Sequence, residues 1–306
     1  MKNRLLVVGH LNLDHVRTQE LEEEEIPGGG ALYTSFAAAL YGDPVDLLST
    51  RCPDLPQSIL DALARAGVNT DNVLPILGKQ RRSSMAYDID LVRTNFAHKS
   101  PLWLQATVEQ VPRHLPLPKC SYSCIYLAPL LAYNQLLYAQ WAHEKGIPVA
   151  MDLSEYYALE NTEAVKNCLG LIDIFMPSEV ELDEIFPELA GDLPAIIEKV
   201  RGYGVSLLVI KRSTAGSLIC CFNEERCYKV GIRPLPHVTD ATGAGDSFNG
   251  AFLSCYLATK DTVLSARYAS AVASCCIQQI SYLGLLHETR EYLLRLAETV
   301  PVEIVR

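Results

Sequence analysis

Short apolar runs alternate with helical patterns through most of this chain, and this alternation limits its fold more than any other feature. The apolar runs expected to form buried strands are Arg4–Val8, Val45–Leu48, Cys124–Leu127, Val149–Met151, Ile172–Phe175 and Ser206–Ile210. The helical patterns between them are Gly30–Tyr41, Ser58–Ala66, Asn134–Lys145, Val180–Ile185 and Leu193–Tyr203. This order predicts an α/β fold with a doubly wound, mostly parallel sheet flanked by helices.

Two segments, residues 10–27 and 80–96, interrupt the alternation. The second alternates like a strand, and we expect it to return as a hairpin. Both are predicted to lie outside the main sheet, as a small β-sheet lid inserted in a single domain that spans residues 1–306. The acidic run Glu22–Glu25 is predicted to be a solvated loop, because four adjacent carboxylates are costly to bury. After Gly250 we expect helices to the end of the chain, with breaks near Lys260 and Gly284–His287.

The net charge of the chain limits the classes of partner that it is expected to bind. A formal net charge of −10 disfavours nucleic acid and anionic membranes. The sequence has no run of about 18 apolar residues, so no membrane-spanning helix is predicted. The ten cysteines form no CxxC pair and stand mostly inside apolar runs. We therefore expect buried thiols and a reducing, cytoplasmic location.

The chemistry is concentrated in the segment Val238–Gly250, which reads VTDATGAGDSFNG. We expect a short strand to end near Asp240 and a helix over Ser247–Leu257, opened by Asp246. Glycines before a helix let its first N–H groups approach a ligand, and the helix terminus favours negative charge. An ionised Asp246 beside such an anion hole is the arrangement that phosphoryl transfer to an alcohol requires. The alternative is an ordinary tight turn with Asp246 as a helix N-cap.

The longer string DATGAGDSFNG resembles the C-terminal signature of the ribokinase-like (PfkB) carbohydrate kinase family. Five further segments resemble other parts of that family in the same order: Leu5–Asp14, the glycines at Gly28–Gly29, Ser58–Val73, Asp173–Glu181 and Ile210–Ser217. The resemblance implies an ATP- and Mg²⁺-dependent kinase, with a β lid over the carboxyl ends of the strands of the main sheet.

The resemblance also assigns roles to individual residues. Asp246 matches the catalytic base, and Gly243, Ala244 and Gly245 match the anion hole. The positions that match acceptor-binding residues are Asn12, Asp14, Gly28, Gly29 and Tyr33, and those that match nucleotide-binding residues are Lys211, Ser213, Gly216 and Thr242. Glu181 matches the residue that helps to hold Mg²⁺ through water. Asp240 matches a position near a monovalent cation site in some members, and whether K⁺ binds here is left open.

Three residues depart from the family pattern. Ser178 replaces the Asn of the NxxE motif, which predicts looser positioning of metal or phosphate. Tyr33 stands where many members have an Asn, and Ser213 stands where the nucleotide turn has a Gly. An aromatic ring at position 33, with Tyr87 in the lid, favours a cyclitol or a base-bearing acceptor.

The leading hypothesis is therefore a kinase that phosphorylates a hydroxyl of a small-molecule sugar or cyclitol. The first alternative is a nucleoside kinase of the same family. The second is a ligand-binding pseudokinase or regulator, which the three departures suggest and the intact GAGD sequence opposes. An exposed lid sheet has free edges, so a homodimer that pairs through the lid is a further hypothesis.

Overall fold

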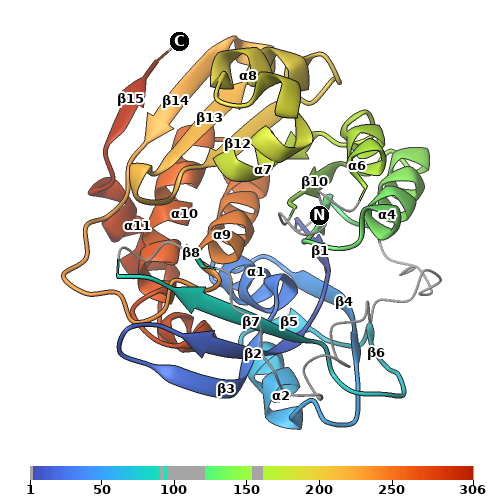
Figure 1. The fold of residues 1–306 in the computed structure, drawn as a ribbon, viewed down its shortest axis with the longest axis vertical. Coiled ribbons are helices and arrows are strands. Elements are labelled where there is room, and N and C mark those ends of the chain that lie inside the picture. The colour runs from blue at the N-terminus through green and yellow to red at the C-terminus, as the bar shows by residue number, and fades with distance from the viewer. Residues whose placement is uncertain (1–2, 90–92, 95–120, 154–160, 306) are drawn as a thin grey trace.

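The computed structural model describes residues 3–89, 93–94, 121–153 and 161–305. An eleven-stranded sheet crosses the molecule in the order β15-β14-β13-β12-β11-β10-β9-β1-β4-β5, with β6 paired to β4 (Figure 1). Its strands are β1 (Leu5–Val8), β4 (Val45–Arg51), β5 (Val68–Asn69), β6 (Val73–Pro75), β9 (Cys124–Leu127), β10 (Val149–Met151), β11 (Ile174–Phe175), β12 (Leu207–Lys211), β13 (Ser217–Cys221), β14 (Arg226–Val230) and β15 (Val302–Ile304). The pairs from β12 through β5 are parallel, and β13, β14 and β15 add antiparallel strands at one edge. The predicted mostly parallel sheet is confirmed.

Helices cover both faces of this sheet. One apolar core lies under α1 (Gly30–Ala39), α2 (Gln57–Arg65), α9 (Ala244–Thr259), α10 (Thr262–Cys276) and α11 (Arg290–Glu298). The other lies under α4 (Ala132–Glu144), α6 (Thr162–Leu169), α7 (Glu179–Ile185) and α8 (Leu193–Arg201). Strand β1 shows the cause: Leu5 and Val7 enter the first core, and Leu6 and Val8 enter the second. Successive side chains of a strand point to opposite faces, so a strand that is apolar throughout requires a cover on each side.

A separate four-stranded sheet has the order β3-β2-β7-β8 and forms the predicted lid. It consists of β2 (Asn12–Arg17), β3 (Glu22–Gly28), β7 (Arg82–Tyr87) and β8 (Arg93–Thr94), and it lies in front of α1 in Figure 1. The buried guanidinium of Arg82 joins two of its strands and the main body, because it pairs with Glu25 at 2.7 Å and with Asp54 at 3.0 Å. Residues 90–92 and 95–96 of the second lid segment lie outside the described residues.

Several local predictions were wrong. Glu22–Glu25 is not a loop but part of β3, with its side chains exposed to solvent. Residues 238–240 form no strand. The Thr239 N–H donates instead to the Ile277 carbonyl, at 2.9 Å, in the loop after α10. Helix α9 begins at Ala244, so Asp246 lies inside its first turn and is not its N-cap. The chain past α11 forms β15 rather than more helix.

Within the described residues, no helix is both long enough and apolar enough to cross a membrane.

Candidate active site

The loop before α9 places a left-handed glycine directly against an aromatic ring. Gly243, the N-cap of α9, has φ of 78°, and a Cβ built on it would lie 2.3 Å from the ring of Tyr33. Only glycine fits both the backbone conformation and the space. The N-cap glycine has no side chain with which to cap the helix, and the Ala244 N–H bonds the Ala241 carbonyl at 3.3 Å. The start of a helix carries a partial positive charge, so it can attract an anion.

Asp246 lies in the first turn of α9 and faces the start of α1. A Cβ built on Gly30, the first residue of α1, would lie 2.7 Å from Asp246 Oδ1. Thr34 of α1 also donates its hydroxyl to the Asp246 carbonyl at 3.1 Å. Burial, followed by the charge of Asp152, raises the pKa of Asp246 to about 6, while Lys211 and Arg93 oppose the rise. The carboxylate is therefore basic enough to accept a proton and still mostly ionised at neutral pH.

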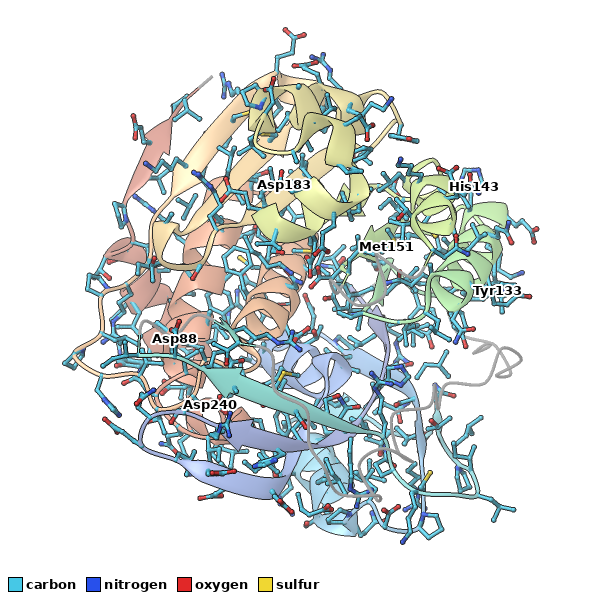
Figure 2. All side chains as sticks on the ribbon, viewed as in Figure 1. Asp88, Tyr133, His143, Met151, Asp183 and Asp240 are labelled. Atoms are coloured by element: carbon cyan, nitrogen blue, oxygen red, sulfur yellow. The ribbon has the colours of Figure 1, made fainter. Side chains whose placement is uncertain are left out.

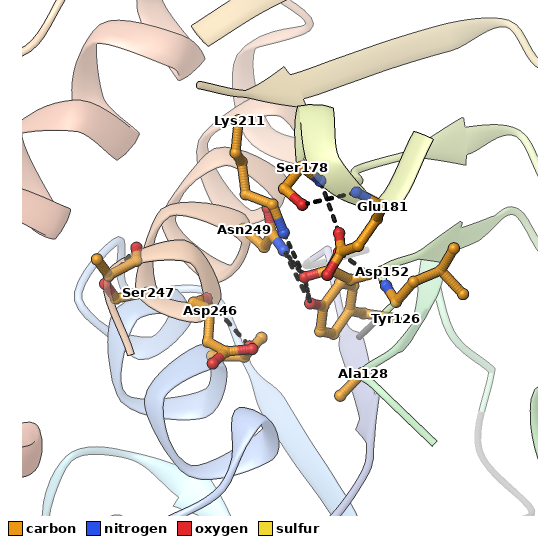
Figure 3. Close-up of polar contacts among 12 residues, drawn as sticks. Tyr126, Ala128, Asp152, Ser178, Glu181, Lys211, Asp246, Ser247 and Asn249 are labelled. Carbon is orange, nitrogen blue, oxygen red and sulfur yellow. Dashed lines mark hydrogen bonds and ion pairs between the residues drawn. The ribbon is translucent and has the colours of Figure 1, made fainter. Parts of the chain in front are cut away.

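A buried polar cluster stands on the other side of the α9 N-terminus (Figure 3). Asp152 follows β10, and its carboxylate accepts hydrogen bonds from Lys211 Nζ and, at 2.7 Å, from Asn249 Nδ2. The backbone N–H of Leu153 donates to its other oxygen at 2.8 Å. A Cβ on Gly245 would lie 3.7 Å from Lys211 Nζ, so the lysine reaches the first turn of α9. Charged side chains at the carboxyl ends of parallel strands therefore lie beside the N-terminus of α9. Ligands of open α/β sheets bind at this end of the strands.

The charge states of this cluster depend on one another. Burial acts to lower the pKa of Lys211, but the carboxylates of Asp152 and Glu181 outweigh it and the lysine remains cationic. Burial, followed by the charge of Asp152, raises the pKa of Glu181 to about 7. Excess negative charge is therefore held close to Lys211, and a cation would relieve it.

Ser178 and Glu181 form a capping box at the start of α7. The Ser178 hydroxyl accepts from the Glu181 N–H at 3.3 Å, and Glu181 Oε2 accepts from the Ser178 N–H at 2.7 Å. Ser178 also forms a β-bridge with Lys211. The serine that departs from the NxxE motif therefore still fixes Glu181 beside the lysine.

The described residues contain no cluster of three or more Asp, Glu, His or Cys side chains able to enclose a metal. Mg²⁺ at a phosphate site needs no such cage, since it keeps several waters and takes one or two carboxylates with the phosphates. Asp152 and Glu181 supply oxygen donors of that kind, so the residues present fit the ion.

The predicted nucleotide residues Ser213 and Gly216 lie in the turn between β12 and β13, directly after Lys211. A Cβ on Gly216 would lie 2.1 Å from the Val230 carbonyl, so this glycine is required by the neighbouring strand β14. Ser213 adopts φ of 50°, a left-handed conformation that is costly for serine. Ser213 therefore adopts a backbone conformation that glycine reaches without strain.

The predicted acceptor residues meet where the lid joins α1. A Cβ on Gly28 would lie 1.8 Å from Asp14 Oδ2, so the carboxylate rests on the Gly28 backbone. Asp14 is buried, and among the described residues neither of its carboxylate oxygens has a well-aligned hydrogen-bond donor, although the Asn12 side chain and the Gly29 N–H lie nearby. Asn12 Oδ1 likewise has no donor among these residues. Burial raises the pKa of Asp14 to about 7 despite the nearby Asn12 and Gly29 N–H. Buried acceptors without donors suit a ligand that brings hydroxyl groups.

Tyr33 lies against Gly243, and Thr242 precedes that glycine in the loop before α9. The side chain of Tyr33 is 1% exposed and its ring is covered by Gly243, so it offers no free face to a nucleobase. Thr242 lies under the lid, where its hydroxyl bonds the Tyr87 hydroxyl at 3.1 Å. Tyr87 thereby joins the lid to the loop that precedes Asp246.

Asp240 acts as a clamp between loops. Its carboxylate accepts from the Thr242 N–H at 2.9 Å and from the Ser281 N–H at 3.4 Å, and Ser281 bonds the Pro27 carbonyl of the lid. Figure 2 shows Asp240 near the lid strands.

Sequence reasoning missed two residues of the buried polar cluster, Asp152 and Asn249. The only available signal was an Asp directly after the apolar run Val149–Met151 and an Asn inside the signature string.

Known proteins resemble this chain over nearly its whole length. The family model of pfkB family carbohydrate kinases matches residues 2–285. The cytidine kinase of Thermococcus kodakarensis is 26% identical over 258 residues, which are 82% of this chain and 88% of that protein. A fructokinase from Xylella fastidiosa with bound ATP superposes with a TM-score of 0.79 at 19% identity, covering 97% of this chain and 99% of the other. A Burkholderia thailandensis nucleoside kinase in complex with inosine gives 0.77 at 17% identity, covering 96% and 97%.

Proposed function

We propose that this chain, which belongs to the pfkB family of carbohydrate kinases, transfers the γ-phosphoryl group of ATP to a hydroxyl of a sugar or cyclitol, with Asp246 as the base. PfkB kinases are phosphotransferases with an alcohol acceptor, and the chain has their ribokinase-like fold. The observation that carries the proposal is the position of Asp246. Its carboxylate lies in the first turn of α9 against Gly30 of α1, and Lys211 reaches the same turn.

The proposed reaction uses each part of the site. Asp246 accepts the proton of the acceptor hydroxyl. The hydroxyl oxygen then forms a bond to the γ-phosphorus of ATP, and ADP leaves. The N–H groups at Gly243, Ala244 and Gly245 stabilise the charge that spreads over the transferred oxygens. Lys211 adds a positive charge beside the same turn. Glu181, with Asp152 nearby, would hold Mg²⁺ through water, and the ion would neutralise phosphate charge.

The acceptor side favours a polyol. Asp14 and Asn12 present buried oxygens that have no well-aligned donor in the described part of the chain, and hydroxyl groups would satisfy them. The Tyr87–Thr242 contact closes the lid over this region, which would exclude water from the transfer.

A nucleoside acceptor is the second candidate. Its support is the likeness to a cytidine kinase and to an inosine-bound nucleoside kinase. The ribose of a nucleoside would meet the same Asp14 and Asn12 oxygens, but the covered ring of Tyr33 removes the stacking platform expected for the base. The regulator hypothesis is weakened by the capping box, because Ser178 keeps Glu181 in place.

The test is an ATP-consumption screen with Mg²⁺ against sugars, cyclitols and nucleosides, with Asp246→Asn as the blank. We expect turnover with one acceptor class that disappears in the blank. Running the screen in K⁺ and in tetramethylammonium salts decides whether a monovalent cation is needed. Measurable binding of ATP with no turnover on any acceptor would contradict the proposal and favour a regulator.

A further inference from the structure

Two cysteines face each other across the hairpin of β13 and β14. Cys220 and Cys227 are directly opposed in the antiparallel register, and their sulfur atoms lie 2.7 Å apart. Directly opposed residues of an antiparallel pair have Cα atoms about 4.5 or 5.5 Å apart, and disulfides span about 4.4 to 6.8 Å. The backbone therefore already holds the separation that a bond between the two sulfurs needs.

The two thiols differ in access. Cys220 is buried in the core under α7 and α8, whereas Cys227 packs against the same core but is partly exposed. A small oxidant in solution thus reaches Cys227 first, and the second thiol lies behind it. This order of exposed and buried partners is the arrangement of an attacking and a resolving cysteine.

The neighbouring Cys221 provides an internal comparison. It follows Cys220 in β13, but its side chain enters the opposite core and its thiol contacts the Thr262 hydroxyl at 3.5 Å. Alternation along the strand separates it from Cys227 by the thickness of the sheet. Sequence proximity would allow either pairing, and only the fold selects Cys220.

We propose that Cys220 and Cys227 form a reversible modification site, an intramolecular disulfide produced by peroxides. The Cys227 sulfur attacks a peroxide oxygen, the O–O bond breaks, and a sulfenic acid forms while the released hydroxide takes the thiol proton to give water. The Cys220 sulfur then attacks the sulfenic sulfur, the S–S bond forms, and the hydroxyl group leaves with the Cys220 proton as a second water. Two thiols are oxidised and one peroxide is reduced, and a dithiol reductant reverses the change.

The disulfide leaves the candidate active site in place. The residue of β13 that pairs with Lys211 is Ser217, three positions before Cys220. Three residues of strand span about 10 Å, and no backbone movement is needed to bring the sulfurs together. The inference does not depend on the proposed kinase function, because its readout is the covalent state of the chain.

The experiment is peptide mapping of the full chain. The reduced protein is treated with hydrogen peroxide, remaining thiols are alkylated, and trypsin is used without reduction. Cleavage after Arg212, Arg226 and Lys229 separates the peptide of residues 213–226, which holds Cys220 and Cys221, from the peptide of residues 227–229. We expect these two peptides to be joined, and separated again by dithiothreitol.

Three variants make the result specific. Cys221→Ser should keep the joined peptide, and Cys220→Ser should lose it and leave Cys227 with added oxygen. Cys227→Ser should leave Cys220 as an alkylated thiol. Alkylation of both Cys220 and Cys227 in treated wild-type protein, with oxidation at other cysteines, would overturn the proposal. Retention of the joined peptide in Cys220→Ser would overturn it as well, since Cys221 would then be the partner.

Discussion

The ring of Tyr33 lies directly against Gly243, so that α1 supports the turn from which α9 begins. A methyl group on Gly243 would come within 2.3 Å of the ring, and its φ of 78° is unfavourable for any other residue. We propose that the N-terminus of α9 binds the phosphoryl group, and its position requires a residue without a side chain at 243.

Gly243→Ala should lower both stability and activity. The cost has two parts, left-handed strain of about 1–2 kcal/mol and the collision with Tyr33. Gly42→Ala is the matched control, since Gly42 also has positive φ (97°) but no atom of the described residues lies within 4 Å of a Cβ built on it. Denaturant unfolding should show a larger loss for Gly243→Ala than for Gly42→Ala. Equal losses would mean that the Tyr33 contact yields easily.

Asp14→Asn should stabilise the free protein at alkaline pH while weakening acceptor binding. The pKa of Asp14 is raised from 3.8 to about 7, so the folded state disfavours its ionised form. Stability conferred by the neutral form is lost as pH rises from about 4 to 7, and above that range the cost reaches an upper bound of about 4 kcal/mol. Unfolding midpoints at pH 8 and pH 5 should show a gain at pH 8 that shrinks at pH 5. A raised KM for the acceptor should accompany the gain, and an unchanged KM would remove Asp14 from the acceptor site.

The pH profile of kcat/KM should have an acidic limb. Asp246 must be ionised to accept a proton, and its pKa is raised to about 6 by burial and by Asp152, against Lys211 and Arg93. Activity is therefore present above pH 6 and declines as pH falls through that value, with Glu181 and Asp14 titrating near 7 in the same range.

Arg93→Gln tests the assignment of that limb. Removing the positive charge should raise the pKa of Asp246 and move the limb to higher pH. Lys199→Gln, an exposed change on α8, should leave the profile unchanged. If the acidic limb stays at the same pH in Arg93→Gln, it reports the titration of a group other than Asp246.

Ser178→Ala should raise the Mg²⁺ concentration needed for half-maximal activity. The change removes the hydroxyl that holds the Glu181 N–H and costs about 1 kcal/mol of stability as a lost helix cap. Thr289→Ala removes a comparable cap from α11, where Thr289 Oγ1 accepts from the Tyr292 N–H. It should cost similar stability with no change in Mg²⁺ dependence. The same Mg²⁺ requirement in both variants would assign Ser178 a structural role alone.

The parts of this site that follow from sequence are those encoded in one contiguous segment. The string around Asp246 locates a helix start, its glycines and its carboxylate together, because all three act within one turn. The Asp152–Lys211 pair could not be found in this way. Asp152 follows β10 and Lys211 ends β12. These two strands are far apart in the sequence, and the two residues meet because only one strand, β11, separates β10 from β12 in the sheet.

Wrong local predictions have a common cause in partners distant along the chain. The run Glu22–Glu25 is acidic enough for a loop, yet β2 pairs with its backbone and Arg82 pairs with Glu25. The segment before the signature has strand-like residues, yet its N–H groups bond the Ile277 carbonyl. Tyr33 is buried against Gly243, and its role at the acceptor stays a prediction.

The most direct test of the account is the kcat of Asp246→Asn, measured beside its nucleotide affinity by calorimetry. Asparagine keeps the size of the side chain but cannot accept the proton. The account predicts nearly unchanged ATP binding and a kcat lowered by about 10²–10⁴-fold, the usual contribution of a positioned base. A variant that binds ATP and keeps most of its kcat would contradict the role assigned to Asp246.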